Sequence, residues 1–77
     1  MKHIEYAQFK IDELEKAIIS NEVEKRVTVL LSLTEKKPDP QLIEAKKKID
    51  TLLTVYKLRL EKWRDILKEL KDGSFSI

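Results

Sequence analysis

The stretch Glu35-Lys36-Lys37-Pro38-Asp39-Pro40 is the one clear break in a sequence that otherwise has the pattern of long helices. Pro38 disfavours helical geometry at the preceding residue and has no amide hydrogen to donate, so a helix that precedes it should end near Thr34. Asp39 is a favourable N-cap, and proline is well tolerated at the first position of a helix. We therefore expect a second helix to begin at Pro40.

Upstream of the break, apolar residues recur at alternating spacings of three and four, which places them on one face of a helix. They are Ile4, Ala7, Ile11, Leu14 and Ile18. Beyond Ile18 the same spacing falls on two polar residues, Asn21 and Lys25. The apolar series resumes in a shifted frame at Val23, Val27, Leu30 and Leu31.

This shift of frame allows two interpretations. A four-residue stutter would let one helix continue, whereas a break at Ser20-Asn21 would let Asn21 cap a new helix, with Glu24 completing a capping box. We favour one continuous helix because neither glycine nor proline stands there. The alternative is a fold of three shorter helices.

Downstream of the break, the apolar residues fit a heptad seam that only Arg59 interrupts. The seam consists of Leu42, Ala45, Ile49, Leu52, Tyr56, Trp63, Ile66 and Leu70, and a flanking row adds Leu53, Leu60 and Leu67. A two-stranded seam needs only two apolar positions per heptad, so this wider stripe is typical of a helix in a bundle. Asp72-Gly73 is expected to end the helix.

These signals predict a single all-α domain over residues 1–77, with a helix over about 2–34, a loop over 35–39, a helix over about 40–72 and a short tail over 73–77. Each helix would be about 50 Å long, and a short loop between equal helices gives an antiparallel helical hairpin. Two helices cannot cover this much apolar surface. We therefore expect a homodimer in which two hairpins form a four-helix bundle with coiled-coil packing.

The apolar pattern also predicts which residues form the hairpin core and the dimer interface. We expect this set to be Ile11, Leu14, Ile18, Ile49, Leu52, Leu53, Tyr56, Leu60, Trp63 and Ile66. Arg59 falls on a seam position, where it would set the register, form an ion pair across the dimer or extend to solvent. The tail residue Phe75 either folds back over the bundle end, docks on a partner or frays with the chain end.

The composition favours helices and self-association over a chemical site. The chain has 39% charged and 42% hydrophobic residues but one glycine and two prolines, which suits long helices. At 77 residues a lone core is marginal without added support. There is no cysteine for a disulfide or thiolate site, and the single histidine, His3, cannot build a histidine-rich zinc site.

Catalysis has little support in the sequence. The chain has no glycine-rich phosphate loop and no Glu-x-x-His motif, and no serine or cysteine stands near His3 in the sequence. Carboxylate pairs such as Asp12/Glu15 lie beside lysines at helical spacing, where surface ion pairing is the ordinary explanation. We therefore predict no catalytic residue, no cofactor and no metal.

Charge and hydropathy narrow the choice of partners. A net charge of +2 is too small to imply nucleic-acid or membrane binding. The basic stretch around Lys46–Arg64 includes Asp50 and Glu61, which favours a solvated face, so weak nucleic-acid binding is only an alternative. With no stretch of 18 apolar residues and no secretory signal pattern, we expect a cytoplasmic protein.

One part of the chain resembles a known family. Asp39-Pro40-Gln41-Leu42-Ile43-Glu44-Ala45, continuing through Ile49-Asp50-Thr51-Leu52-Leu53 to Tyr56, is similar to the second helix of the small sporulation-regulating aspartyl-phosphate phosphatases of spore-forming bacteria, and Ile11 and Leu14 resemble that family's opening pattern. Those proteins are short helical hairpins that dock on a phosphorylated response regulator and promote loss of its phosphoryl group. The resemblance implies that Asp50 is the motif aspartate. Its apolar companions would be Leu52, Leu53 and Tyr56.

The expected function follows from the amphipathic surface. We expect a small non-enzymatic protein–protein interaction module or regulator, of a size that fits a bacterial or phage protein, with Asp50, Arg59 and Phe75 as candidate contacts to a protein partner. A response-regulator phosphatase is the alternative. It comes second because Lys46 stands where the family motif has serine.

Overall fold

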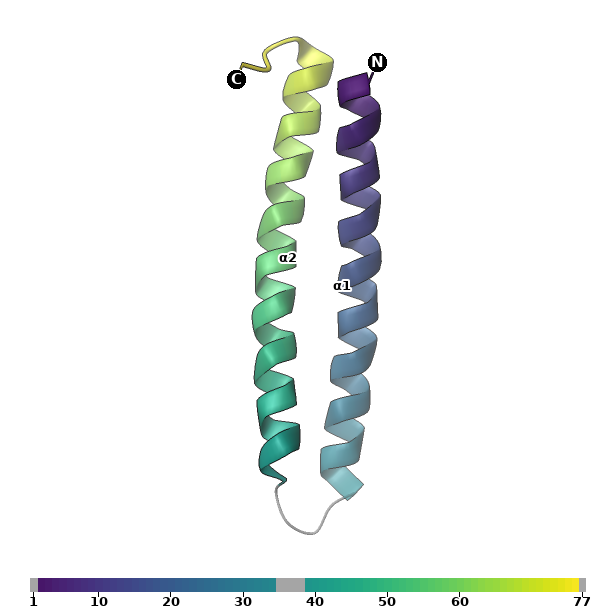
Figure 1. Ribbon diagram of the computed structural model, residues 1–77, viewed down its shortest axis with the longest axis vertical. Helices are drawn as coiled ribbons and strands as arrows, with labels where there is room; N and C mark the ends of the chain where they lie inside the picture. The colour runs from purple at the N-terminus through teal and green to yellow at the C-terminus, as the bar shows by residue number, and fades with distance from the viewer. Residues whose placement is uncertain (1, 35–38, 77) are drawn as a thin grey trace.

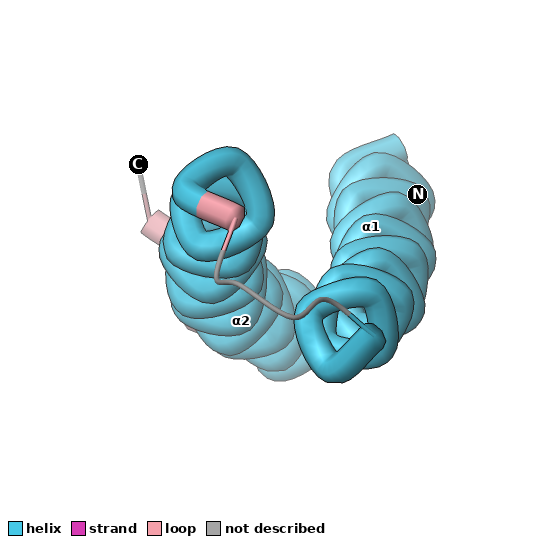
Figure 2. Tube along the Cα trace, turned by 90° about the horizontal axis from the view of Figure 1, so that it is seen from below, coloured by secondary structure: helices cyan, strands magenta, loops and turns pink. Residues whose placement is uncertain are grey.

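A computed structural model of the chain describes residues 2–34 and 39–76 and shows an all-helical hairpin. Helix α1 spans Lys2–Thr34 and helix α2 spans Pro40–Asp72, each with 33 residues. The two helices run antiparallel along their whole length, so both chain ends lie at the same end of the hairpin (Figure 1). The molecule is a rod of 57 × 17 × 13 Å, and a view along its length shows the two helices side by side (Figure 2).

The start of α2 is fixed by the cap that the sequence predicts. Asp39 has extended backbone angles, and its Oδ1 accepts a hydrogen bond from the Gln41 amide at 2.9 Å. Its carbonyl accepts from the amides of Leu42 and Ile43, at 3.1 Å each. Pro40 occupies the first helical turn, where a missing amide hydrogen costs nothing. Of the expected loop 35–39, only Asp39 is among the described residues.

The end of α2 follows from one glycine. Gly73 has a φ of 76°, in the left-handed region that glycine enters without steric cost. At this turn the amides of Gly73 and Ser74 both donate to the Glu69 carbonyl, the Ser74 bond at 2.9 Å, and together they close the last turn of the helix. The chain therefore leaves the helix axis at this point, and the tail begins.

Helix α1 is continuous through Ser20-Asn21, so the continuous-helix interpretation is confirmed and the three-helix alternative is wrong. Asn21 does not act as a cap, because its side-chain amide donates back to the Ala17 carbonyl at 2.8 Å. A side chain bonded to the preceding turn leaves the helical hydrogen bonds in place.

The hydrophobic core lies between the helices, toward the end that carries the chain termini. Its buried members are Ile11, Ile18, Leu53 and Leu60, and the half-buried residues packed against them are Leu14, Ile49, Tyr56, Trp63 and Leu67. Ala7 is also buried. In the half of the hairpin nearer the loop, the only buried side chain among the described residues of α1 is that of Thr28.

On α2 the structure changes the expected arrangement of rows. The residues packed toward α1 are 49, 53, 56, 60, 63 and 67, which alternate by four and three, so the row expected to flank the seam is its centre. Leu52 is 40% exposed and Arg59 is exposed, while Ile66 is half-buried. These three residues share one heptad position. Each directly precedes a residue at the centre of the seam, so it is turned by about 100° around the helix and lies at the side of the seam.

On α1 the expected stutter does not occur. The seam keeps its original frame beyond Ile18, so Asn21 and Lys25 are half-buried and Thr28 is buried, with Val29 half-buried beside it. The apolar residues that were expected to resume the core are exposed instead: Val23, Val27, Leu30 and Leu31. A continuous helix with unchanged winding keeps its phase. Lys25 then pairs with Asp50 on α2, while the side chains of Asn21 and Thr28 donate to carbonyls of α1 itself.

Within the described ranges, neither helix offers an apolar stretch long enough to cross a bilayer.

Candidate functional site

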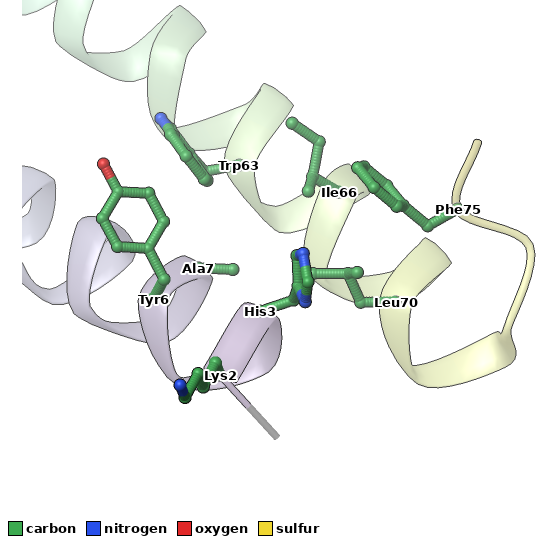
Figure 3. Close-up of a pocket in the computed structure, with 8 residues that line it drawn as sticks. All are labelled: Lys2, His3, Tyr6, Ala7, Trp63, Ile66, Leu70 and Phe75. Atoms are coloured by element: carbon green, nitrogen blue, oxygen red, sulfur yellow. The ribbon is translucent and has the colours of Figure 1, made fainter. Parts of the chain in front are cut away.

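An apolar pocket lies at the end of the hairpin that carries both chain termini (Figure 3). Its volume is about 480 Å³. Helix α1 contributes Lys2, His3, Tyr6 and Ala7 to its walls, helix α2 contributes Trp63, Ile66 and Leu70, and the tail contributes Phe75. The pocket thus brings the first turns of the chain together with the end of α2 and the tail that follows it.

Ring contacts hold the walls of this pocket. Tyr6 and Trp63 meet edge to face with their ring centres 5.8 Å apart, a favoured aromatic geometry. His3 and Phe75 face each other at 6.4 Å with tilted planes. The Lys10 ammonium lies 5.6 Å from the centre of the Tyr6 ring, within range of a cation–π contact. The pocket therefore has two aromatic pairs, one of which depends on the tail.

The chemistry of the lining suits an apolar group. Its side chains are aromatic and aliphatic except for Lys2 and His3, which come from the first turn of α1. Such a surface can take up an aliphatic or aromatic side chain of another protein. Among residues 2–34 and 39–76, no cluster of histidine or carboxylate side chains has the arrangement of a metal site.

A second apolar surface follows the outer side of α1 in the half nearer the loop. We call it the outer stripe and define it as Ile19, Val23, Val27, Leu30 and Leu31, whose side chains are between 44% and 63% exposed. At about 100° per residue these positions lie on the side of α1 away from α2. Full burial of such a side chain provides about 1.5–3 kcal/mol. At this exposure roughly half of that gain is not realised in the single hairpin.

Ion pairs between α1 and α2 occur at several levels of the part of the hairpin that the structure describes. Lys25 and Asp50 are separated by 2.6 Å, Arg64 and Glu15 by 3.3 Å, and Lys57 and Glu22 by 3.9 Å. All six side chains are substantially exposed, so each pair contributes little stability and mainly fixes the relative positions of the helices.

The three residues expected to contact a partner do not form one site. Asp50 lies in the half of the hairpin near the loop and is bound to Lys25. Arg59 lines a shallow groove between the helices with Leu14 and Tyr56. Phe75 lines the pocket at the opposite end from the loop. Sequence reasoning selected Phe75 for its apolar character in a short tail, but it did not identify Tyr6 or His3 as its neighbours.

No protein-family model, no curated protein and no solved structure matches this chain. The resemblance to the sporulation phosphatases therefore stays a prediction.

Proposed function

We propose that this chain is a small non-enzymatic protein-interaction module that works as a homodimer, in which two hairpins form a four-helix bundle. The observation that carries the proposal is the amount of surface that one hairpin leaves exposed. A compact monomer of 9.1 kDa exposes about 4,900 Å². This hairpin exposes 6346 Å².

The surplus has the size of a stable interface. It amounts to about 1,400 Å², whereas each partner in a typical protein complex contributes about 800 Å². The radius of gyration, 17.2 Å, also exceeds the value of about 11 Å for a compact chain of this length. A second copy packed along the rod would cover the surplus and bring the assembly closer to globular proportions.

The pocket at the open end supports a further contact, with an unlike protein. Tyr6, Trp63 and Phe75 form an aromatic surface at the tip of the rod, and large aromatic side chains are enriched among the residues that dominate binding energy at interfaces. In a bundle of two antiparallel hairpins, this end remains available to a partner protein that inserts an apolar side chain.

Sedimentation equilibrium of the purified chain tests the dimer. We expect a mass of twice 9.1 kDa at tens of micromolar protein, with dissociation on dilution. A mass of one chain at every concentration up to several hundred micromolar would contradict the proposal. Far-ultraviolet circular dichroism of the same samples should show a helical protein, which excludes unfolding as the cause of a monomeric result.

A further inference from the structure

We infer that the outer stripe of α1 is the surface on which the second copy docks, so that α1 of one chain packs against α1 of the other. This inference rests on the proposed homodimer but not on the four-helix bundle: because the stripe faces away from α2, the two copies would meet through α1 alone, with each α2 on the outside. The exposed apolar side chains are not evenly spread: of the twelve large ones among the described residues, six lie between Ile19 and Leu33. The stripe is therefore the main concentration of unburied apolar surface on the hairpin.

The opposite side of the same segment is polar and already has partners. Lys25 is paired with Asp50 on α2, and the Thr28 hydroxyl donates to the Glu24 carbonyl at 2.9 Å. The segment thus turns its polar side to α2 and its apolar side away from it, the reverse of the pattern at Ile11 and Ile18. An amphipathic helix buries its apolar side, so this half of α1 requires another protein surface to cover its outer side.

A second copy of the chain fits this surface well. The stripe consists only of valine, leucine and isoleucine, and Ile19, Val23, Val27 and Leu30 follow one another at spacings of four, four and three. This spacing gives the ridge that packs into the groove of an equivalent helix. A two-fold dimer uses the same patch on both chains, and the surplus surface of one hairpin is large enough for such an interface.

Helix α2 provides a matched control. Leu58 is as exposed as the members of the stripe, but it lies on the outer side of α2, about 120° around the helix from the exposed Leu52. A charged residue at Leu58 therefore changes hydrophobicity and charge as a substitution in the stripe does, without touching the proposed interface.

The test compares Val27→Glu with Leu58→Glu by sedimentation equilibrium, beside the unaltered chain. A carboxylate buried at a helix contact carries a large desolvation cost, so Val27→Glu should raise the dissociation constant of the dimer by about tenfold or more. Leu58→Glu should leave it within about threefold of the unaltered value, because surface substitutions have small effects. Circular dichroism should show the same helical content in all three proteins.

Two results would overturn the inference in different ways. If the unaltered chain is a dimer and Val27→Glu dimerises equally well, the stripe is not the interface and only the homodimer stands. If the unaltered chain is a monomer, the homodimer and its interface both fail.

A variant that keeps the apolar packing completes the test. Val27→Cys chains should be joined by a short bismaleimide crosslinker, and Leu58→Cys chains should not.

Discussion

Lys25 on α1 and Asp50 on α2 form an ion pair with their charged atoms 2.6 Å apart, at a level of the hairpin where the seam lacks an apolar pair. Lys25 occupies the α1 seam position that Ile11 and Ile18 hold nearer the chain termini, whereas Asp50 lies beside the seam residue Ile49 on α2. The ion pair gives a partner to the polar residue that the heptad spacing brings to the α2 side, so α1 can keep one frame over its whole length.

We expect a measurable but small coupling between these two residues. In a double-mutant cycle with Lys25→Met and Asp50→Asn, the coupling in the free energy of unfolding should be about 0.5 to 1 kcal/mol, because both side chains are partly exposed. It should fall as salt is added. The Lys57–Glu22 pair, at 3.9 Å and more exposed, is the control and should show less coupling. A larger coupling in the control would refute this account of the seam.

Leu52 and Leu53 give a matched pair for the arrangement of rows on α2. Leu53 is 6% exposed and belongs to the core, so Leu53→Ala should lower the free energy of unfolding by about 2 to 5 kcal/mol. Leu52 lies at the side of the seam, so Leu52→Ala should lower the free energy of unfolding by about 1 kcal/mol or less. Urea unfolding at one protein concentration compares them. Equal losses would show that the row of Leu52 is buried as deeply as that of Leu53.

The cap of α2 should be required for full stability. Asp39→Ala removes the acceptor for the Gln41 amide and should cost about 1 kcal/mol in the free energy of unfolding. Asp39→Asn keeps a side-chain oxygen in the same place and should retain most of that stability. Thermal unfolding followed by circular dichroism measures both changes. If alanine and asparagine behave alike, the side-chain bond does not stabilise the helix.

Trp63 is the only tryptophan of the chain, so its fluorescence reports on the pocket. Tyr6→Ala removes the ring that covers its edge and should shift the emission to longer wavelength, as water gains access. Phe9→Ala is the control, because Phe9 and Tyr6 are both 55% exposed but Phe9 does not line the pocket. A red shift of equal size in the control would mean that Trp63 does not sense this site.

The sequence was sufficient for features that depend on neighbouring residues. Asp39 and Pro40 define the start of α2, and Gly73 defines its end, because caps and left-handed turns act within one helical turn. The continuity of α1 through Ser20-Asn21 likewise followed from the lack of a residue that breaks helices.

Features that depend on contacts with the other helix could not be predicted from neighbouring residues in the sequence. The apolar residues Val23 and Val27 indicate a shifted seam, yet they are exposed, because the unchanged frame of α1 turns Lys25 and Thr28 toward α2 instead. The pocket depends on the turn at Gly73, which brings Phe75 back beside His3. No local pattern predicts that contact.

Small-angle X-ray scattering over a dilution series tests the central claim most directly, because it reports mass and shape together. We predict a scattering mass of twice 9.1 kDa at high concentration, falling toward one chain on dilution as the radius of gyration approaches that of the single rod. A mass of one chain throughout, with a constant radius of gyration near 17.2 Å, would contradict the homodimer.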